Sequence, residues 1–160
     1  MELLKKRFEF YKSECGKHLN ILEKDLEELR GYFPLSERKI KALIQREDFL
    51  RIFDQIAYRF SKFQDTLGKL LKTYLILKGE SVENLPLIDA VNLAYRYGFP
   101  IDEDRWWELR TLRNALTHEY PESYGEIAEA INRIRELMPL LKASYEFLKA
   151  TDTPPRGNSD

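Results

Sequence analysis

The chain has 160 residues, of which 26 are Lys or Arg and 27 are Asp or Glu, so its formal net charge is −1 and no global positive field attracts nucleic acid or an anionic membrane. The hydrophobic share of 43% and the charged share of 33% are typical of one folded domain, which we expect over residues 1–150. One Cys and two His exclude an internal disulfide and a Cys/His zinc cluster of the usual spacing, and no apolar stretch reaches signal-peptide or membrane-spanning length. We therefore expect a cytoplasmic protein without a metal or cofactor.

The N-terminal half has apolar residues at helical spacing. An amphipathic helix is predicted over residues 2–30, followed by a short helix for which Ser36 is a suitable N-cap. From Phe49 to Leu77 the apolar intervals alternate between four and three, which predicts a long helix packed in a bundle. Gly68 interrupts that helix, and we expect another backbone to approach closely there. Gly79 is expected to end the helix.

The C-terminal half predicts three more helices. The first lies over residues 86–97, and Asp102 caps the second, which carries the motif discussed below. The third spans residues 124–149, and Pro139 is expected to kink it. Residues 151–160 have the composition of a disordered tail. No alternating strand pattern occurs, so the sequence predicts an all-α fold, an antiparallel bundle of about five helices.

The motif helix ends in Arg-Asn-Ala-Leu-Thr-His-Glu-Tyr-Pro, residues 113–121. Arg113 and His118 are five positions apart and would not share a face of a regular helix, so they converge only if the helix ends near His118. Arg110, Asn114 and His118 follow one another at intervals of four and are predicted to form one polar stripe.

An Arg and a His in one site suit metal-independent cleavage of RNA. The imidazole can activate the ribose 2′-hydroxyl or protonate the leaving oxygen, while the guanidinium stabilises charge on the phosphorane. A full acid–base cycle works best with two titrating groups, so we expect a two-fold dimer that brings His118 and Arg113 of both protomers into one cleft. The alternative is structural: a His in a last helical turn commonly offsets the helix dipole, and an Arg one turn earlier is often ion-paired.

Three other residue types carry weaker signals. Trp106 and Trp107 point in different directions, so one is expected in the core and the other at an interface or stacked on a base. His18 lies on a charged helix without a recognisable partner and is interpreted as structural. Cys15 falls on an apolar stripe and is expected to be a small buried hydrophobe.

The segment Arg113-Asn114-Ala115-Leu116-Thr117-His118-Glu119-Tyr120 resembles the Arg-x-x-x-x-His-x-Tyr signature of HEPN-domain proteins, in particular the HepT-type partners of minimal nucleotidyltransferases. The segment Arg59-Phe60-Ser61-Lys62-Phe63-Gln64-Asp65-Thr66-Leu67-Gly68 is similar to the long central helix of the same group. The resemblance implies a HEPN-like bundle that dimerises through the long central and motif helices.

The same resemblance implies a toxin–antitoxin role. Arg113 and His118 would be ribonuclease residues, Asn114 and Arg110 supporting groups, and RNA the substrate, with tRNA as one implied target. A cognate minimal nucleotidyltransferase would silence the toxin by transferring AMP to Tyr120, because a bulky negative group there repels the RNA phosphate.

The motif helix is formally acidic, whereas RNA affinity needs a surplus of Lys and Arg, which Lys69 and Lys72 could supply after folding. Two alternatives to a ribonuclease therefore stay open. The chain could instead be a non-catalytic substrate-binding partner of a nucleotidyltransferase. It could also be an oligomeric bundle in which Arg113 and His118 only hold an interface.

Overall fold

The structure is a computed structural model that describes residues 1–117 and 123–150. These residues form an all-α bundle without a strand, as the sequence predicts. The helices are α1 (Glu2–Glu28), α2 (Glu37–Leu43), α3 (Glu47–Leu77), α4 (Leu87–Arg96), α5 (Glu103–Leu116) and α6 (Tyr124–Lys149), with a 3₁₀ turn η1 (Arg30–Tyr32) after the first.

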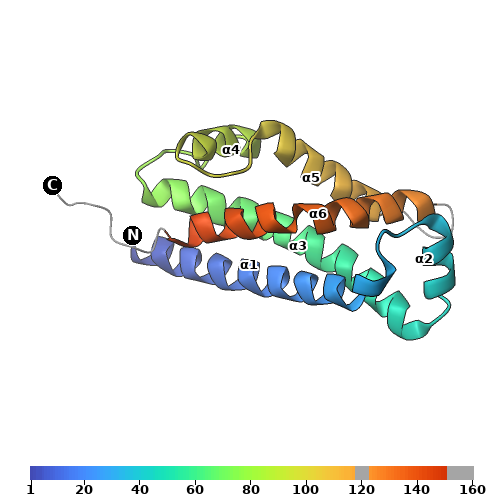
Figure 1. Ribbon diagram of the computed structural model, residues 1–160. Helices are drawn as coiled ribbons and strands as arrows, with labels where there is room; N and C mark the ends of the chain where they lie inside the picture. The colour runs from blue at the N-terminus through green and yellow to red at the C-terminus, as the bar shows by residue number, and fades with distance from the viewer. Residues whose placement is uncertain (118–122, 151–160) are drawn as a thin grey trace.

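Four of these helices make the bundle. α1 packs along α3, α6 lies against both, and α5 packs on α6 and α3 (Figure 1). α1 and α5 run in one direction while α3 and α6 run in the other, so each of the pairs α1/α3 and α5/α6 is antiparallel. The short helix α2 closes one end of the bundle against α6, and α4 bridges α3 and α5.

The apolar stripe of α3 forms the centre of the core. Nine apolar positions follow the alternating intervals of four and three along this helix, and we call them the seam. Leu77 is half-buried and the other eight are buried: Phe49, Phe53, Ile56, Phe60, Phe63, Leu67, Leu70 and Tyr74. Burial of a large apolar side chain contributes roughly 1.5–3 kcal/mol, so this stripe supplies much of the driving force for folding. The prediction of a bundle helix at this place is confirmed.

Capping groups set the helix boundaries. The Ser36 hydroxyl accepts a hydrogen bond from the Lys39 amide at 3.2 Å, and Asp102 Oδ1 accepts one from the Arg105 amide at 2.9 Å. At the C-terminus of α3, Gly79 adopts φ +95°, and the Glu80 amide donates to the Leu75 carbonyl. This reversal satisfies carbonyl groups that the helix leaves open, and it requires a backbone conformation that favours glycine.

Three details differ from expectation or extend it. α1 ends at Glu28 rather than near residue 30, because the chain tightens into η1 before Gly31. The neighbour that approaches Gly68 is a side chain, not a backbone: a Cβ at this position would lie 3.0 Å from Cδ2 of Leu87 in α4. α6 runs as one helix through Pro139, and a kink there stays a prediction.

One side chain ties distant segments together at the α2 end. The Asn132 amide of α6 accepts a hydrogen bond from the Leu35 amide at 2.8 Å and donates one to the Leu35 carbonyl at 2.9 Å. This pair of bonds holds the connector before α2 against α6. Across the described ranges 1–117 and 123–150, no helix combines the length and apolarity needed to cross a membrane.

Candidate functional site

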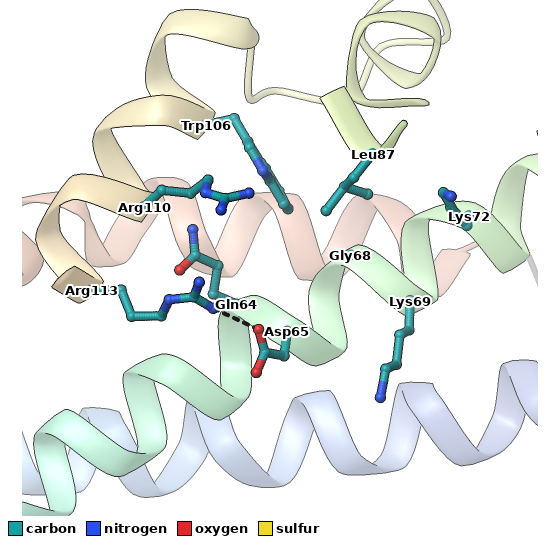
Figure 2. Close-up of a pocket in the computed structure, with 9 residues that line it drawn as sticks. All are labelled: Gln64, Asp65, Gly68, Lys69, Lys72, Leu87, Trp106, Arg110 and Arg113. Carbon is teal, nitrogen blue, oxygen red and sulfur yellow. Dashed lines mark hydrogen bonds and ion pairs between the residues drawn. The ribbon is translucent and has the colours of Figure 1, made fainter. Parts of the chain in front are cut away.

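A cavity of about 400 Å³ lies between α3, α4 and α5. Figure 2 shows its walls, with one side formed by successive turns of α3 and the other by α5. Its nine lining residues are Gln64, Asp65, Gly68, Lys69, Lys72, Leu87, Trp106, Arg110 and Arg113. Helical spacing explains the set, because Gln64, Gly68 and Lys72 are four residues apart on α3, and Trp106, Arg110 and Arg113 are four and three apart on α5.

The described part of the cavity wall is strongly cationic, with two Lys and two Arg against a single carboxylate. That carboxylate, Asp65, forms an ion pair with Arg113, with 2.7 Å between Oδ1 and Nη1 (Figure 2). Lys72 donates a hydrogen bond from Nζ to the Leu85 carbonyl at 2.7 Å, while the Lys69 ammonium lies 6.0 Å from the centre of the Tyr11 ring. Lys69 and Lys72 thus line the cavity of the two motif-helix arginines, but their ammonium groups are turned to these partners, that of Lys69 toward α1 (Figure 2).

Gln64 is the unusual member of this wall. Only 4% of the residue is exposed, and among the described residues neither its Oε1 nor its Nε2 has a hydrogen-bond partner. Its amide is turned into the space between α3 and α5, beneath the Arg110 side chain (Figure 2). Buried amides are normally hydrogen-bonded, so this one departs from the usual pattern.

α5 is fixed to α6 on the side away from the cavity. Glu108 accepts a hydrogen bond from Arg133 Nε at 2.6 Å and a second from Arg105 one turn earlier in α5. The hydrogen bond from Arg133, followed by that from Arg105, holds the pKa of Glu108 below its usual value. Glu108 is therefore ionised at neutral pH and clamps the motif helix at its middle.

The structure divides the predicted motif residues. Arg110 and Arg113 line the same cavity, whereas Asn114 lines a second hollow of about 500 Å³ between α5 and α6. Arg110 and Asn114 keep their spacing of four within α5, but they line different hollows, and Arg110 shares its cavity with Arg113. The motif helix ends at Leu116 with Thr117 as C-cap, close to the predicted end. His118 and Tyr120 lie outside the described residues.

The two tryptophans separate as the sequence predicts. Trp106 is fully buried and contributes to the cavity wall, while Trp107 is 45% exposed on the outer side of α5. The Arg110 guanidinium lies 5.3 Å from the centre of the Trp107 ring, within the range of a cation–π contact. One tryptophan thus belongs to the core, and the other offers an exposed aromatic surface next to the motif arginines.

His18 has a partner that the sequence did not reveal. Arg59 Nη1 lies 2.8 Å from His18 Nδ1, and because a guanidinium can only donate, Nδ1 accepts and the neutral ring carries its proton on Nε2. Burial, followed by the charge of Arg59, lowers the pKa of His18. The pair lines a hollow of about 360 Å³ between α1 and α3, which shares Asp65 and Lys69 with the first cavity.

Sequence reasoning missed two residues of this site, Gln64 and Asp65, and only Gln64 carried a sequence signal. Gln64 follows Phe60 by four positions and precedes Leu67 by three, so helical spacing puts a polar amide beside the buried seam. Asp65 had no such signal, because its pairing with Arg113 joins residues 48 positions apart. Cys15, by contrast, is fully buried as predicted, and burial raises the pKa of its thiol.

The comparisons with known proteins give only distant relatives. No model of a protein family matches the chain, and no solved structure matches it. Two curated proteins do: "Nucleotide-binding protein Teth514_1178" of Thermoanaerobacter sp. (strain X514) and "Nucleotide-binding protein Teth39_0666" of Thermoanaerobacter pseudethanolicus (strain ATCC 33223 / 39E). Each is 27% identical over 134 residues, which cover 81% of this chain and 46% of the relative. The chain thus spans about half the length of the curated relatives it matches.

The cavity has groups for binding anions. Guanidinium and ammonium groups on one wall can hold phosphate oxygens, and an amide can pair with a polar edge. Within the described ranges, no three His, Cys, Asp or Glu side chains gather as metal ligands.

Proposed function

We propose that this chain is a HepT-like toxin that cleaves RNA without a metal ion, with Arg113 and His118 as its catalytic residues. The observation that carries the proposal is the shared cavity wall of Arg110, Arg113, Lys69 and Lys72. Although the motif helix is acidic as a sequence, this wall has the local surplus of positive charge that RNA binding needs. The resemblance of residues 113–120 to the HEPN signature supports the same assignment for His118.

The proposed chemistry follows from the side chains. His118 accepts the proton of a ribose 2′-hydroxyl, whose oxygen attacks the adjacent phosphorus and displaces the 5′-oxygen of the next nucleotide. Arg113 neutralises the charge that develops on the phosphorane, and Arg110 holds a neighbouring phosphate. The products are a 2′,3′-cyclic phosphate and a free 5′-hydroxyl, after the leaving oxygen gains a proton from a second titrating group.

A homodimer and an antitoxin complete the proposal. The second titrating group is the His118 of another copy, which a two-fold axis near α3 and α5 would bring into the same cleft. The exposed Trp107 ring supports an interface on this side of the bundle. The cognate minimal nucleotidyltransferase then silences the site by transferring AMP to Tyr120.

A second candidate function is a non-catalytic substrate-binding partner of a nucleotidyltransferase. It is favoured by the ion pair that occupies Arg113 with Asp65, because a paired guanidinium is less available to a phosphorane. The two relatives are named as nucleotide-binding proteins, which agrees with a binding role.

Incubation of the protein with total RNA in EDTA tests the two candidates. The ribonuclease proposal expects cleavage that Arg113→Ala and His118→Ala abolish, with cyclic-phosphate ends and with helicity and oligomeric state unchanged. Arg38→Ala is the matched control, because Arg38 is exposed on α2, away from the cavity. Intact RNA together with a stable complex with a minimal nucleotidyltransferase would overturn the ribonuclease and favour the binding partner.

A further inference from the structure

Gln64 makes an unusual residue choice for its position. It sits on the buried side of α3 between Phe60 and Leu67, where a leucine would match its neighbours in volume and polarity. An amide buried without hydrogen bonds lowers the free energy of unfolding, because folding removes its hydrogen bonds to water and no hydrogen bond within the protein replaces them. Both amide atoms are in this state, and both belong to a side chain that lines a cavity.

The cavity around Gln64 has the size and polarity of a ligand site. Its volume of about 400 Å³ falls in the range of small-molecule pockets. Gly68, without a side chain, and Leu87 supply apolar surface, while Arg110 and Arg113 supply positive charge beside Gln64 (Figure 2). An unpaired amide beside several cations is suited to a ligand that carries both a polar edge and a phosphate.

We infer that this cavity is a nucleotide-recognition site in which the Gln64 amide binds the edge of an adenine base and the cations bind the attached phosphate. An amide offers one donor and one acceptor side by side, and a glutamine matches the N6 donor and N7 acceptor of adenine with two hydrogen bonds. The inference deepens the proposed function, since it makes Gln64 the residue that selects which nucleotide of an RNA occupies the site.

Arg110 controls access to the amide. Its guanidinium lies over Gln64 in Figure 2, and within the described residues it has no carboxylate at ion-pair distance. Its side chain is exposed and is held by the Trp107 ring, a contact that a phosphate can replace. A bound phosphate thus draws Arg110 away from the amide and opens the amide to the base.

Isothermal titration with AMP, adenosine and inorganic phosphate tests the inference. We expect AMP to bind the wild-type protein, Gln64→Leu to weaken AMP binding at least about tenfold, and phosphate binding to be unchanged in that variant. Arg110→Ala should weaken both AMP and phosphate. Gln45→Leu is the matched control, because Gln45 lies exposed beyond α2 and its side-chain amide donates to the Lys41 carbonyl, far from the cavity.

Several outcomes would overturn the inference. The first is that Gln64→Leu binds AMP as tightly as the wild-type protein does. The second is that the wild-type protein binds none of AMP, GMP, CMP and UMP. The third is that it binds GMP, CMP or UMP more tightly than AMP. Thermal melts of Gln64→Leu establish that the variant folds, so a loss of binding reports the site.

The RNA assay separates this inference from the proposed function. If AMP binding depends on Gln64 and the protein does not cleave RNA, the result supports the nucleotide site and overturns the ribonuclease proposal. If cleavage depends on Arg113 and the Gln64→Leu variant cleaves with the same sequence preference as the wild type, the result supports the ribonuclease proposal and overturns the role of Gln64.

Discussion

Asp65 Oδ1 and Arg113 Nη1 lie 2.7 Å apart and join α3 to the last turn of α5. The guanidinium side chain is 25% exposed and the carboxylate side chain 53% exposed, so water screens the pair. Such pairs are worth little to the fold, about 0.2–1 kcal/mol. The stronger effect of this pair is on charge, because Asp65 is the single acidic group among the described residues that line the cavity.

Asp65→Asn is expected to raise RNA affinity. Removing the carboxylate releases Arg113 and takes one negative charge from the cavity, for a gain of up to about fivefold at low salt. Fluorescence anisotropy with a labelled RNA measures the change, and the melting temperature should shift little. Glu47→Gln, which opens the exposed Glu47–Arg51 pair, is the control and should leave affinity unchanged. Weaker binding by Asp65→Asn would show that Asp65 instead positions Arg113 productively.

Gln64→Leu is expected to stabilise the protein. The substitution removes two buried polar atoms that have no partner and adds apolar contacts in the seam, with a gain of about 1–3 kcal/mol in the free energy of unfolding. Urea denaturation measures it. A loss of stability would indicate that the amide is already satisfied, by an internal water for example.

The His18–Arg59 contact is expected to make stability depend on pH. The pKa of His18 is lowered from 6.5 in the folded chain, so the unfolded chain binds the proton more tightly. The contribution of His18 is complete above pH 6.5 and is lost as the pH falls from that value through the lower folded pKa. Urea denaturation between about pH 7.5 and pH 5 should show this decline in the wild type and less of it in His18→Gln.

The other histidine provides the control for this pH dependence. His118→Ala keeps His18 and should retain the decline. An equal slope in the wild type and in His18→Gln would contradict the prediction.

Gly98→Ala is expected to destabilise the protein by about 1–2 kcal/mol. Gly98 has φ +110°, which costs an alanine energy, and the new Cβ would lie 3.2 Å from the Phe147 ring. The matched substitution Gly31→Ala meets no atom within 4 Å and has no positive φ, so thermal melting should show little change there. Equal melting temperatures for the two variants would argue against strain at the end of α4.

The sequence predicted the helices well because each carries a local signal. The alternating intervals of α3, the caps Ser36 and Asp102, and the glycine at position 79 all act within a few residues of the boundary they set. The candidate site was predicted less completely. The arginines were found by their motif, but their cavity depends on α3 facing α5, and no local pattern encodes which residues meet across two helices. For this reason the sequence did not indicate that Arg110 and Asn114 line different hollows.

The partner of His18 was missed for the same reason, since Arg59 is 41 residues away in the chain. Helical spacing identified His18 as lying on a charged helix and could not show that its ring is buried against α3. The pairing of Asp65 with Arg113 is equally non-local.

The clamp on Glu108 gives α5 two attachments of unequal strength. Toward α6 the helix is held by Arg133, and toward α3 by the exposed pair of Arg113 with Asp65. A ligand that competes for Arg113 would therefore replace the exposed pair with Asp65 and leave the hydrogen bonds of Glu108 in place. The buried side chains Leu109, Leu112 and Leu116 keep α5 packed in the core, so such a replacement changes the charge of the cavity wall and not the position of the helix.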